Sequence, residues 1–207
     1  GGGGGWEKTG PGGSFPLPAE ASANASLERS MKVRVKGHHQ IGTVREIAER
    51  WGLTVRLSRA AEKGPAFREM LDCAVVVSRR ARTLAGAAYA SERRIVLNAR
   101  LLESGCEDDR NATFLHECAH VLADLFYERP CRHGARWREM MRLLGEVPNV
   151  RHRIPYLSRE ANAKIIWRCK GCGQAYHYVR RPWRKLEDCY CADCGPERGR
   201  LCEERPV

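Results

Sequence analysis

The sequence has no apolar segment long enough to cross a membrane. Its longest apolar run lies around residues 74–77, whereas a membrane-spanning helix needs about 20 apolar residues. A secretory signal is also missing, because neither a basic start nor an apolar segment precedes Ala21-Ser22-Ala23, which imitates a signal-peptidase site. We therefore expect a soluble, cytoplasmic protein with no membrane partner, in which cysteines stay reduced.

Material for a core is scarce at the start of the chain. Eight glycines occur in the first 13 residues, with Pro11, Pro16 and Pro18 close by. This composition predicts disorder, and we assign residues 1–36 to a disordered Gly/Pro-rich extension. The chain does not begin with methionine, so Met31 is a candidate translation start.

The remaining length suffices for one core and a small accessory module. The chain has 207 residues, of which 43% are hydrophobic, and a main domain of about 100–150 residues can bury a core. We place this domain at residues 37–150, a linker at 151–163 and a C-terminal module at 164–207.

Apolar periodicity predicts helices and strands in the main domain. Residues 41–51 repeat apolar side chains at helical spacing, and Thr43 with Glu46 is typical of a capping box. We expect this helix to pack across the helix that begins near residue 107. Residues 71–78 and 84–98 are typical of strands, the second segment being a hairpin. We therefore expect an α+β domain with three or four helices against a short antiparallel sheet of three strands.

One motif indicates a metal site. His116-Glu117-Cys118-Ala119-His120 places two imidazoles one helical turn apart, where both can bind one metal ion. Glu117 lies beside them and is our candidate general base. Acids occupy the first turn of this helix, Pro130 ends it, and Ala119 and Ala123 would keep the metal side open. An apolar stripe on the helix supports its burial against a core. This stripe comprises Phe114, Cys118, Val121, Leu122 and Leu125.

Two residues compete for the third ligand position. His133 opens a second helix, while Glu139 lies 19 residues after His120, a spacing that a His/His/Glu site also uses. On one helix these positions are about 120° apart, so only one can face the metal. We favour His133, because Gly134 permits a close approach and Trp137 anchors its side. The metzincin pattern is absent, since Ala123 and Phe126 occupy its Gly and His positions.

The C-terminal module carries a second metal motif. Its two Cys-x2-Cys pairs have the spacing of a four-cysteine zinc ribbon, and they are Cys169, Cys172, Cys191 and Cys194. Cys189 is a rival for the third position, and a disulfide arrangement is the alternative in an oxidising compartment. We expect Cys73 and Cys118 to be ordinary buried thiols, and we assign no ligand role to Cys106 and Cys202. Cys131 is close in sequence to His133, so an approach to the metal of the three histidines is an alternative for this thiol.

The charge pattern of this module favours nucleic acid. The chain carries a formal net charge of +11, and residues 162–186 include seven basic residues and no acid. Cations alternating with aromatic rings suit DNA, especially single-stranded DNA, although a solvated basic hairpin gives the same composition. The candidate contacts are Lys170, Arg180, Arg181, Trp183, Arg184 and Lys185.

Three segments together resemble a known family. These are the residues from His116 to His120, the residues from His133 to Met141, and the hairpin with Thr83–Tyr89 and Ile95–Asn98. They resemble the SprT-like (SprT/Spartan-like) zinc metalloproteases, and the Cys-rich end is similar to the zinc ribbon of bacterial members. The resemblance implies a zincin-like domain, nucleoid association, and DNA-associated or DNA-crosslinked proteins as substrates, with cleavage gated by DNA.

We therefore expect a zinc metalloprotease with one catalytic and one structural zinc ion. His116, His120 and His133 would hold the catalytic ion, and Glu117 would activate water. Tyr127, His152 and Tyr156 are open candidates for stabilising the oxyanion. The alternatives are a non-catalytic nucleic-acid-binding zinc protein linked to transcription or stress response, and a general cytosolic peptidase with an incidental ribbon.

Overall fold

The computed structural model describes residues 37–150 and 153–206. The expected disorder of residues 1–36, the candidate start at Met31 and the candidate His152 lie outside the described residues. Within the described part, no helix is long and apolar enough to span a bilayer.

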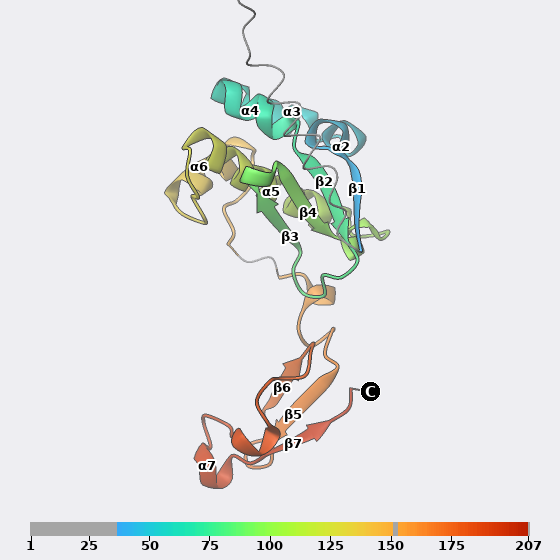
Figure 1. Cartoon of the computed structure of the whole chain (residues 1–207), viewed down its shortest axis with the longest axis vertical. Coiled ribbons are helices and arrows are strands. Elements are labelled where there is room, and N and C mark those ends of the chain that lie inside the picture. The colour runs from blue at the N-terminus through green and yellow to red at the C-terminus, as the bar shows by residue number, and fades with distance from the viewer. Residues whose placement is uncertain (1–36, 151–152, 207) are drawn as a thin grey trace, which may run out of the picture. The chain divides into compact units, whose positions relative to one another are not determined.

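The main domain combines a mixed sheet with five helices, which confirms the α+β class (Figure 1). Its strands are β1 (His38–Thr43), β2 (Ala74–Ser78), β3 (Gly86–Tyr89) and β4 (Arg94–Asn98). Its helices are α2 (Val44–Arg50), α3 (Thr54–Ser58), α4 (Gly64–Leu71), α5 (Glu107–Phe126) and α6 (Ala135–Leu143).

The sheet differs from the expected three antiparallel strands. Its order is β1-β2-β4-β3, and β2 pairs with β4 in parallel, while the other two pairs are antiparallel. The hairpin of β3 and β4 is confirmed, but β4 inserts between β2 and β3, so β3 forms the outer edge. The additional strand β1 was missed because its sequence is polar and its pairing with β2 is interrupted at Gly42.

The helix α2 begins as the sequence predicts. Thr43 accepts a hydrogen bond from the Glu46 backbone, and the Glu46 side chain accepts one from Thr43, which completes the capping box. The prediction that α2 packs across α5 is wrong, because α4 is the helix that contacts α5 extensively. At the end of α2, the Trp51 ring packs edge-on against Phe114 of α5 with centroids 5.3 Å apart.

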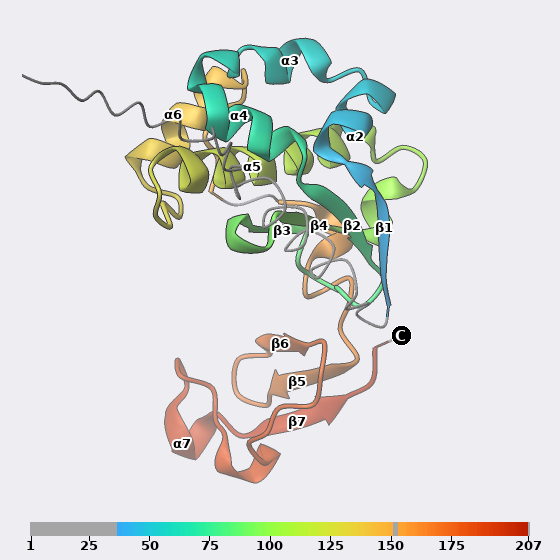
Figure 2. The same cartoon turned by 45° about the horizontal axis from the view of Figure 1, so that its top comes forward.

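The helix α5 is the centre of the main domain. It packs against β3 and β4 and also contacts α4 and α6 (Figure 2). Three acids occupy its first turn, where the helix dipole favours negative charge, and it ends before Pro130 as predicted. The predicted stripe from Phe114 to Leu122 is fully buried, and Leu125 is partly buried.

The predicted linker contributes to the core of the main domain. Ile154 and Leu157 are buried among its apolar residues. Arg100 donates hydrogen bonds to the Tyr156 carbonyl oxygen and to Asn162, at 3.4 Å from Asn162 Oδ1. The chain is therefore part of the main domain as far as residue 157.

The C-terminal module is a small antiparallel sheet with the order β6-β5-β7. Its strands are β5 (Ile165–Cys169), β6 (Ala175–Tyr178) and β7 (Leu201–Glu204), and a short helix α7 (Gly195–Arg198) precedes β7. Trp167 is its buried apolar centre and lies 4.8 Å from the Tyr178 ring. With so little apolar burial, this module needs a further source of stability, which a bound metal can supply.

Candidate metal centre and cleft

Three imidazoles from two successive segments converge in the main domain. His133 Nε2 lies 3.1 Å from Nε2 of His116 and 3.1 Å from Nε2 of His120. Three nitrogens around a tetrahedral zinc ion would be about 3.3 Å apart at normal Zn–N lengths. The donor set therefore fits a zinc ion, with a fourth position left for a small ligand.

The loop before α6 places His133. Asp124 of α5 accepts a hydrogen bond of 2.7 Å from the Cys131 backbone, and Gly134 donates one of 3.1 Å to the Cys131 carbonyl. A Cβ on Gly134 would lie 3.1 Å from that same carbonyl, so glycine suits this tight turn. The helix α6 itself begins at Ala135, so His133 precedes it by two residues instead of opening it.

Glu139, the rival for the third position, has other partners. Its carboxylate accepts hydrogen bonds of 2.7 Å from the Tyr127 hydroxyl and 3.0 Å from Lys63. It is not part of the three-histidine group, whose donor atoms all lie within 4.8 Å of one another. The structure therefore favours His133 as the third ligand.

Trp137 forms a shared wall behind the three imidazoles. Its ring lies 4.8, 5.3 and 4.6 Å from the rings of His116, His120 and His133, and it stacks on His120 at 26°. The indole is fully buried, one turn into α6 from His133. Sequence reasoning predicted contact with His133 alone, because the return of α6 onto α5 is a tertiary feature.

Burial shifts the pKa values of His120 and Glu117 in the site. Burial, followed by the nearby His133, lowers the pKa of His120 to about 4, so its lone pair is free to bind metal at neutral pH. Glu117 is 5% exposed, and burial raises its pKa to about 8. Such a carboxyl holds a proton more readily than an exposed one, which suits a group that accepts and returns a proton.

Gly86 on the edge strand lies against Glu117. A Cβ at Gly86 would be 2.8 Å from Glu117 Oε1 and 2.9 Å from both Glu117 Cγ and Thr113 Cγ2. Glycine at this position therefore gives the carboxylate its space. The sequence predicts the hairpin that contains Gly86 but no role for this glycine, since nothing in the sequence shows that β3 crosses α5 at Glu117.

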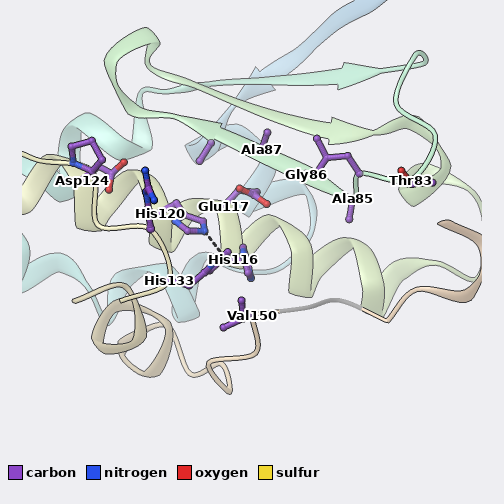
Figure 3. Close-up of a pocket in the computed structure, with 14 residues that line it drawn as sticks. Thr83, Ala85, Gly86, Ala87, His116, Glu117, His120, Asp124, His133 and Val150 are labelled. Atoms are coloured by element: carbon purple, nitrogen blue, oxygen red, sulfur yellow. Dashed lines mark hydrogen bonds between the residues drawn. The ribbon is translucent and has the colours of Figure 1, made fainter. Parts of the chain in front are cut away.

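A cleft of about 560 Å³ runs between α5, the edge strand β3 and the loop before α6. His116, Glu117, His120 and Asp124 line it from a single strip of α5, as Figure 3 shows. Ala119 and Ala123 do not keep this side open, because both are fully buried in the core. The other lining residues are Thr83–Ala88, Pro130, Arg132, His133 and Val150.

Tyr127 and Tyr156, the two oxyanion candidates within the described residues, do not line this cleft. Tyr127 donates to Glu139 and lies under the Arg136 guanidinium, 4.3 Å from its ring centroid. The Tyr156 hydroxyl is buried without a partner in the described part of the chain, and burial raises its pKa. Arg132 is a cleft residue that sequence reasoning missed; it has φ of 44°, a backbone conformation unusual for a residue other than glycine.

Four cysteines form a second group of possible metal ligands, those of the two predicted Cys-x2-Cys pairs. The Gly171 backbone donates to Cys169 Sγ at 3.3 Å, and Cys172 and Cys191 Sγ lie 3.7 Å apart. The Tyr176 hydroxyl donates to Cys191 Sγ at 3.1 Å and lowers the pKa of that thiol to about 6, a contact the sequence analysis did not foresee. This cluster is compatible with a zinc ribbon.

The remaining cysteines lie outside this group. Cys189, the rival for the third position, is not part of it. Cys73 and Cys118 are buried, as expected. Cys131 donates to the carbonyls of Ala123 and Arg129, at 3.6 and 3.3 Å, and so does not join the three histidines.

The basic residues of the C-terminal module divide into paired and unpaired groups. Arg181 forms a two-point pair with Glu203, with contacts of 2.7 and 3.0 Å. Lys185 lies 3.8 Å from Glu187. Trp183 is 87% exposed, and the Arg184 guanidinium lies 4.9 Å from its ring centroid. Lys170 and Arg180 are exposed and form no ion pair within the described residues.

Comparisons with known proteins match the same region. The model of the SprT-like family matches residues 54–157. Proteins named Protein SprT from Pseudomonas fluorescens and Pseudomonas putida are 35% identical, and one from Pseudomonas entomophila is 31% identical. Each match covers 86 residues, 41% of this chain and 52% of the relative, so the chain spans about half the length of these relatives. No solved structure matches the chain.

Proposed function

The chain belongs to the SprT-like family, and on that basis we propose that it is a zinc-dependent endopeptidase acting on DNA-associated or DNA-crosslinked proteins. The observation that carries the hydrolytic part is the convergence of His116, His120 and His133 within 4.8 Å beside the buried Glu117. This arrangement opens into a cleft and is not enclosed in the core.

His116, His120 and His133 would hold the zinc ion, and the four-cysteine group would hold a second, structural ion. A zinc ion with three protein ligands lowers the pKa of a bound water and polarises a carbonyl. Glu117 takes the proton of the attacking water and delivers it to the leaving amine. Trp137 packs against all three imidazoles and holds them in position.

The edge strand β3 suits an extended peptide. Only one side of β3 pairs within the sheet, with β4, and its residues Gly86–Ala88 line the cleft. An extended substrate can therefore add to this edge by backbone hydrogen bonds, as peptides do on other exposed strands. This placement would bring a peptide bond past Glu117, because the Glu117 side chain occupies the space beside Gly86 that a Cβ would fill.

The proposal of a DNA partner rests on the C-terminal module. Trp183 offers an exposed ring for base stacking, and Arg180, Arg184 and Lys170 offer cations for phosphates. We expect Arg181 to contribute less than its neighbours, because the Glu203 carboxylate already holds its guanidinium. Single-stranded DNA is the favoured form, since its bases are free to stack.

One variant tests the hydrolytic part. Glu117→Gln should keep both zinc ions, because the three imidazoles are unchanged, and should lose cleavage of an unfolded protein such as casein. Zinc content by atomic absorption confirms that the site is loaded. Undiminished cleavage by Glu117→Gln, with contaminating proteases excluded, would remove Glu117 from the mechanism.

A second experiment tests the substrate class. The zinc-loaded protein is incubated with a DNA-binding protein alone, with single-stranded DNA and with duplex DNA. Faster cleavage in the presence of DNA supports the proposal. Equal cleavage with and without DNA indicates a general peptidase, and DNA binding without any cleavage indicates a non-catalytic nucleic-acid-binding protein.

A further inference from the structure

A second basic surface lies on the main domain, in the connection between β2 and β3. This connection contains Arg79, Arg80 and Arg82, and we call residues 79–82 the arginine loop. From Arg79 to Ser91 the sequence has no acidic residue. These arginines lie outside the basic segment of residues 162–186 and have no part in the proposed function.

Buried polar side chains fix the backbone of the arginine loop. Ser78 Oγ accepts hydrogen bonds of 3.3 Å from the backbone of both Arg80 and Ala81. Asn98 Nδ2 donates to the carbonyls of Ala81 and Leu84, at 3.2 and 2.9 Å. Ser78 and Asn98 are 4% and 2% exposed. The loop is therefore held on the ends of β2 and β4, while its arginines are exposed.

Neither Arg79 nor Arg82 forms an ion pair with a carboxylate within residues 37–150 and 153–206. The nearby Arg93 and Arg94 differ, since they pair with Glu69 and Glu92 at 2.8 and 2.5 Å. Exposed arginines without carboxylate partners leave their guanidinium donors free for an external anion.

The arginine loop leads directly into the cleft. Thr83, Leu84 and Ala85 follow Arg82 in the chain and line the cleft wall. In Figure 3, Thr83 and Ala85 lie at the end of the cleft opposite Asp124. Arg82 therefore directly precedes the cleft wall in the chain, at the end of the cleft opposite Asp124.

We propose that the arginine loop binds the phosphate backbone of the nucleic acid that carries the substrate protein. This inference rests on the proposed function, and it adds a DNA contact on the catalytic domain itself. Guanidinium groups bind phosphate oxygens through paired hydrogen bonds, and several closely spaced cations match a polymer with one charge per nucleotide. An acidic peptide is the competing ligand, but a peptide paired along β3 has only its end near this loop.

Alanine variants of the full-length, zinc-loaded protein test the proposal. Arg79→Ala with Arg82→Ala removes two cations from the loop, and Arg68→Ala with Arg142→Ala is the matched control. Arg68 and Arg142 are exposed on α4 and α6 and form no ion pair in the described part of the chain. Both double variants lower the net charge equally, so a general effect of charge appears in both.

Binding of a labelled oligonucleotide is measured by fluorescence anisotropy at several salt concentrations. Losing two phosphate contacts should reduce the slope of log affinity against log salt by about 1.4 for single-stranded DNA and about 1.8 for duplex. We expect this loss in the arginine-loop variant only. Cleavage of a neutral peptide without DNA should stay at the wild-type rate in both variants, and this rate reports on the hydrolase independently.

Three results would overturn the proposal. The first is a wild-type salt slope in the arginine-loop variant, and the second is an equal reduction of the salt slope in both double variants. The third is unchanged DNA affinity of the arginine-loop variant combined with slower cleavage of peptides that carry acidic residues. The last result would mean that the loop binds acidic peptide. Failure of wild type to cleave the neutral peptide both with and without DNA would instead count against the hydrolase.

Discussion

Gly86→Ala gives the sharpest test of how the edge strand and Glu117 act together. The added methyl would lie 2.8 Å from Glu117 Oε1, whereas ordinary contacts begin at about 3.4 Å. The carboxylate or the strand must therefore move by about 0.6 Å. The backbone of Gly86 does not have the positive φ that favours glycine, so the effect is steric and not a backbone strain.

The size of the effect follows from this displacement. A misplacement of about 1 Å in an active site costs on the order of 100-fold in rate. We expect Gly86→Ala to lower kcat/KM by roughly 10- to 100-fold, which corresponds to about 1.4 to 2.7 kcal/mol. Overpacking should also lower the free energy of unfolding by about 1 to 3 kcal/mol. Zinc content should not change, because the methyl meets none of the three imidazoles.

The assay compares cleavage of a fluorogenic peptide, zinc content and thermal unfolding. Thr113→Ser provides a control and a rescue, because Thr113 Cγ2 is the other atom that the new methyl would meet, at 2.9 Å. Alone, this change should leave cleavage close to wild type. Combined with Gly86→Ala, it should restore part of the lost rate by giving the methyl room away from Glu117. Wild-type kcat/KM in Gly86→Ala would refute the reasoning.

Three further predictions concern the metal centres and the thiols. His133→Ala should reduce the zinc content from about two ions to one, while Glu139→Ala should retain both; loss of zinc in Glu139→Ala would reverse our choice of ligand. Trp137→Ala should weaken binding of the catalytic ion by about 10- to 100-fold in a chelator competition, and Trp137→Phe should weaken it less; wild-type affinity in Trp137→Ala would show that the indole does not position the imidazoles. Burial raises the pKa of Cys73 to about 12 and also raises that of Cys118. Neither thiol should therefore react with iodoacetamide in the native protein up to pH 9. Chelation of zinc should expose four more cysteines to labelling. Mass spectrometry locates the label, and early modification of Cys73 would contradict its burial.

Local patterns predicted much of the fold. The capping box at Thr43 and Glu46, the helix α5 and the hairpin of β3 and β4 depend on residues close together in the chain, so their signals are visible in the sequence. The helices α3 and α4 were missed because neither has a side-chain cap, the signal that marks the start of α2. The parallel pairing of β2 with β4 was missed because strand order depends on how distant segments pack.

The candidate site shows the same division. The sequence determined the ligand types and spacings, because His116 and His120 are one helical turn apart and the four cysteines form two short knuckles. Only the tertiary structure favoured His133 over Glu139 as the candidate third ligand, placed Gly86 against Glu117 and showed that the arginine loop leads into the end of the cleft. Those relations join residues 17 to about 40 positions apart, and their distances depend on how β3, α5 and α6 pack, which no local periodicity encodes.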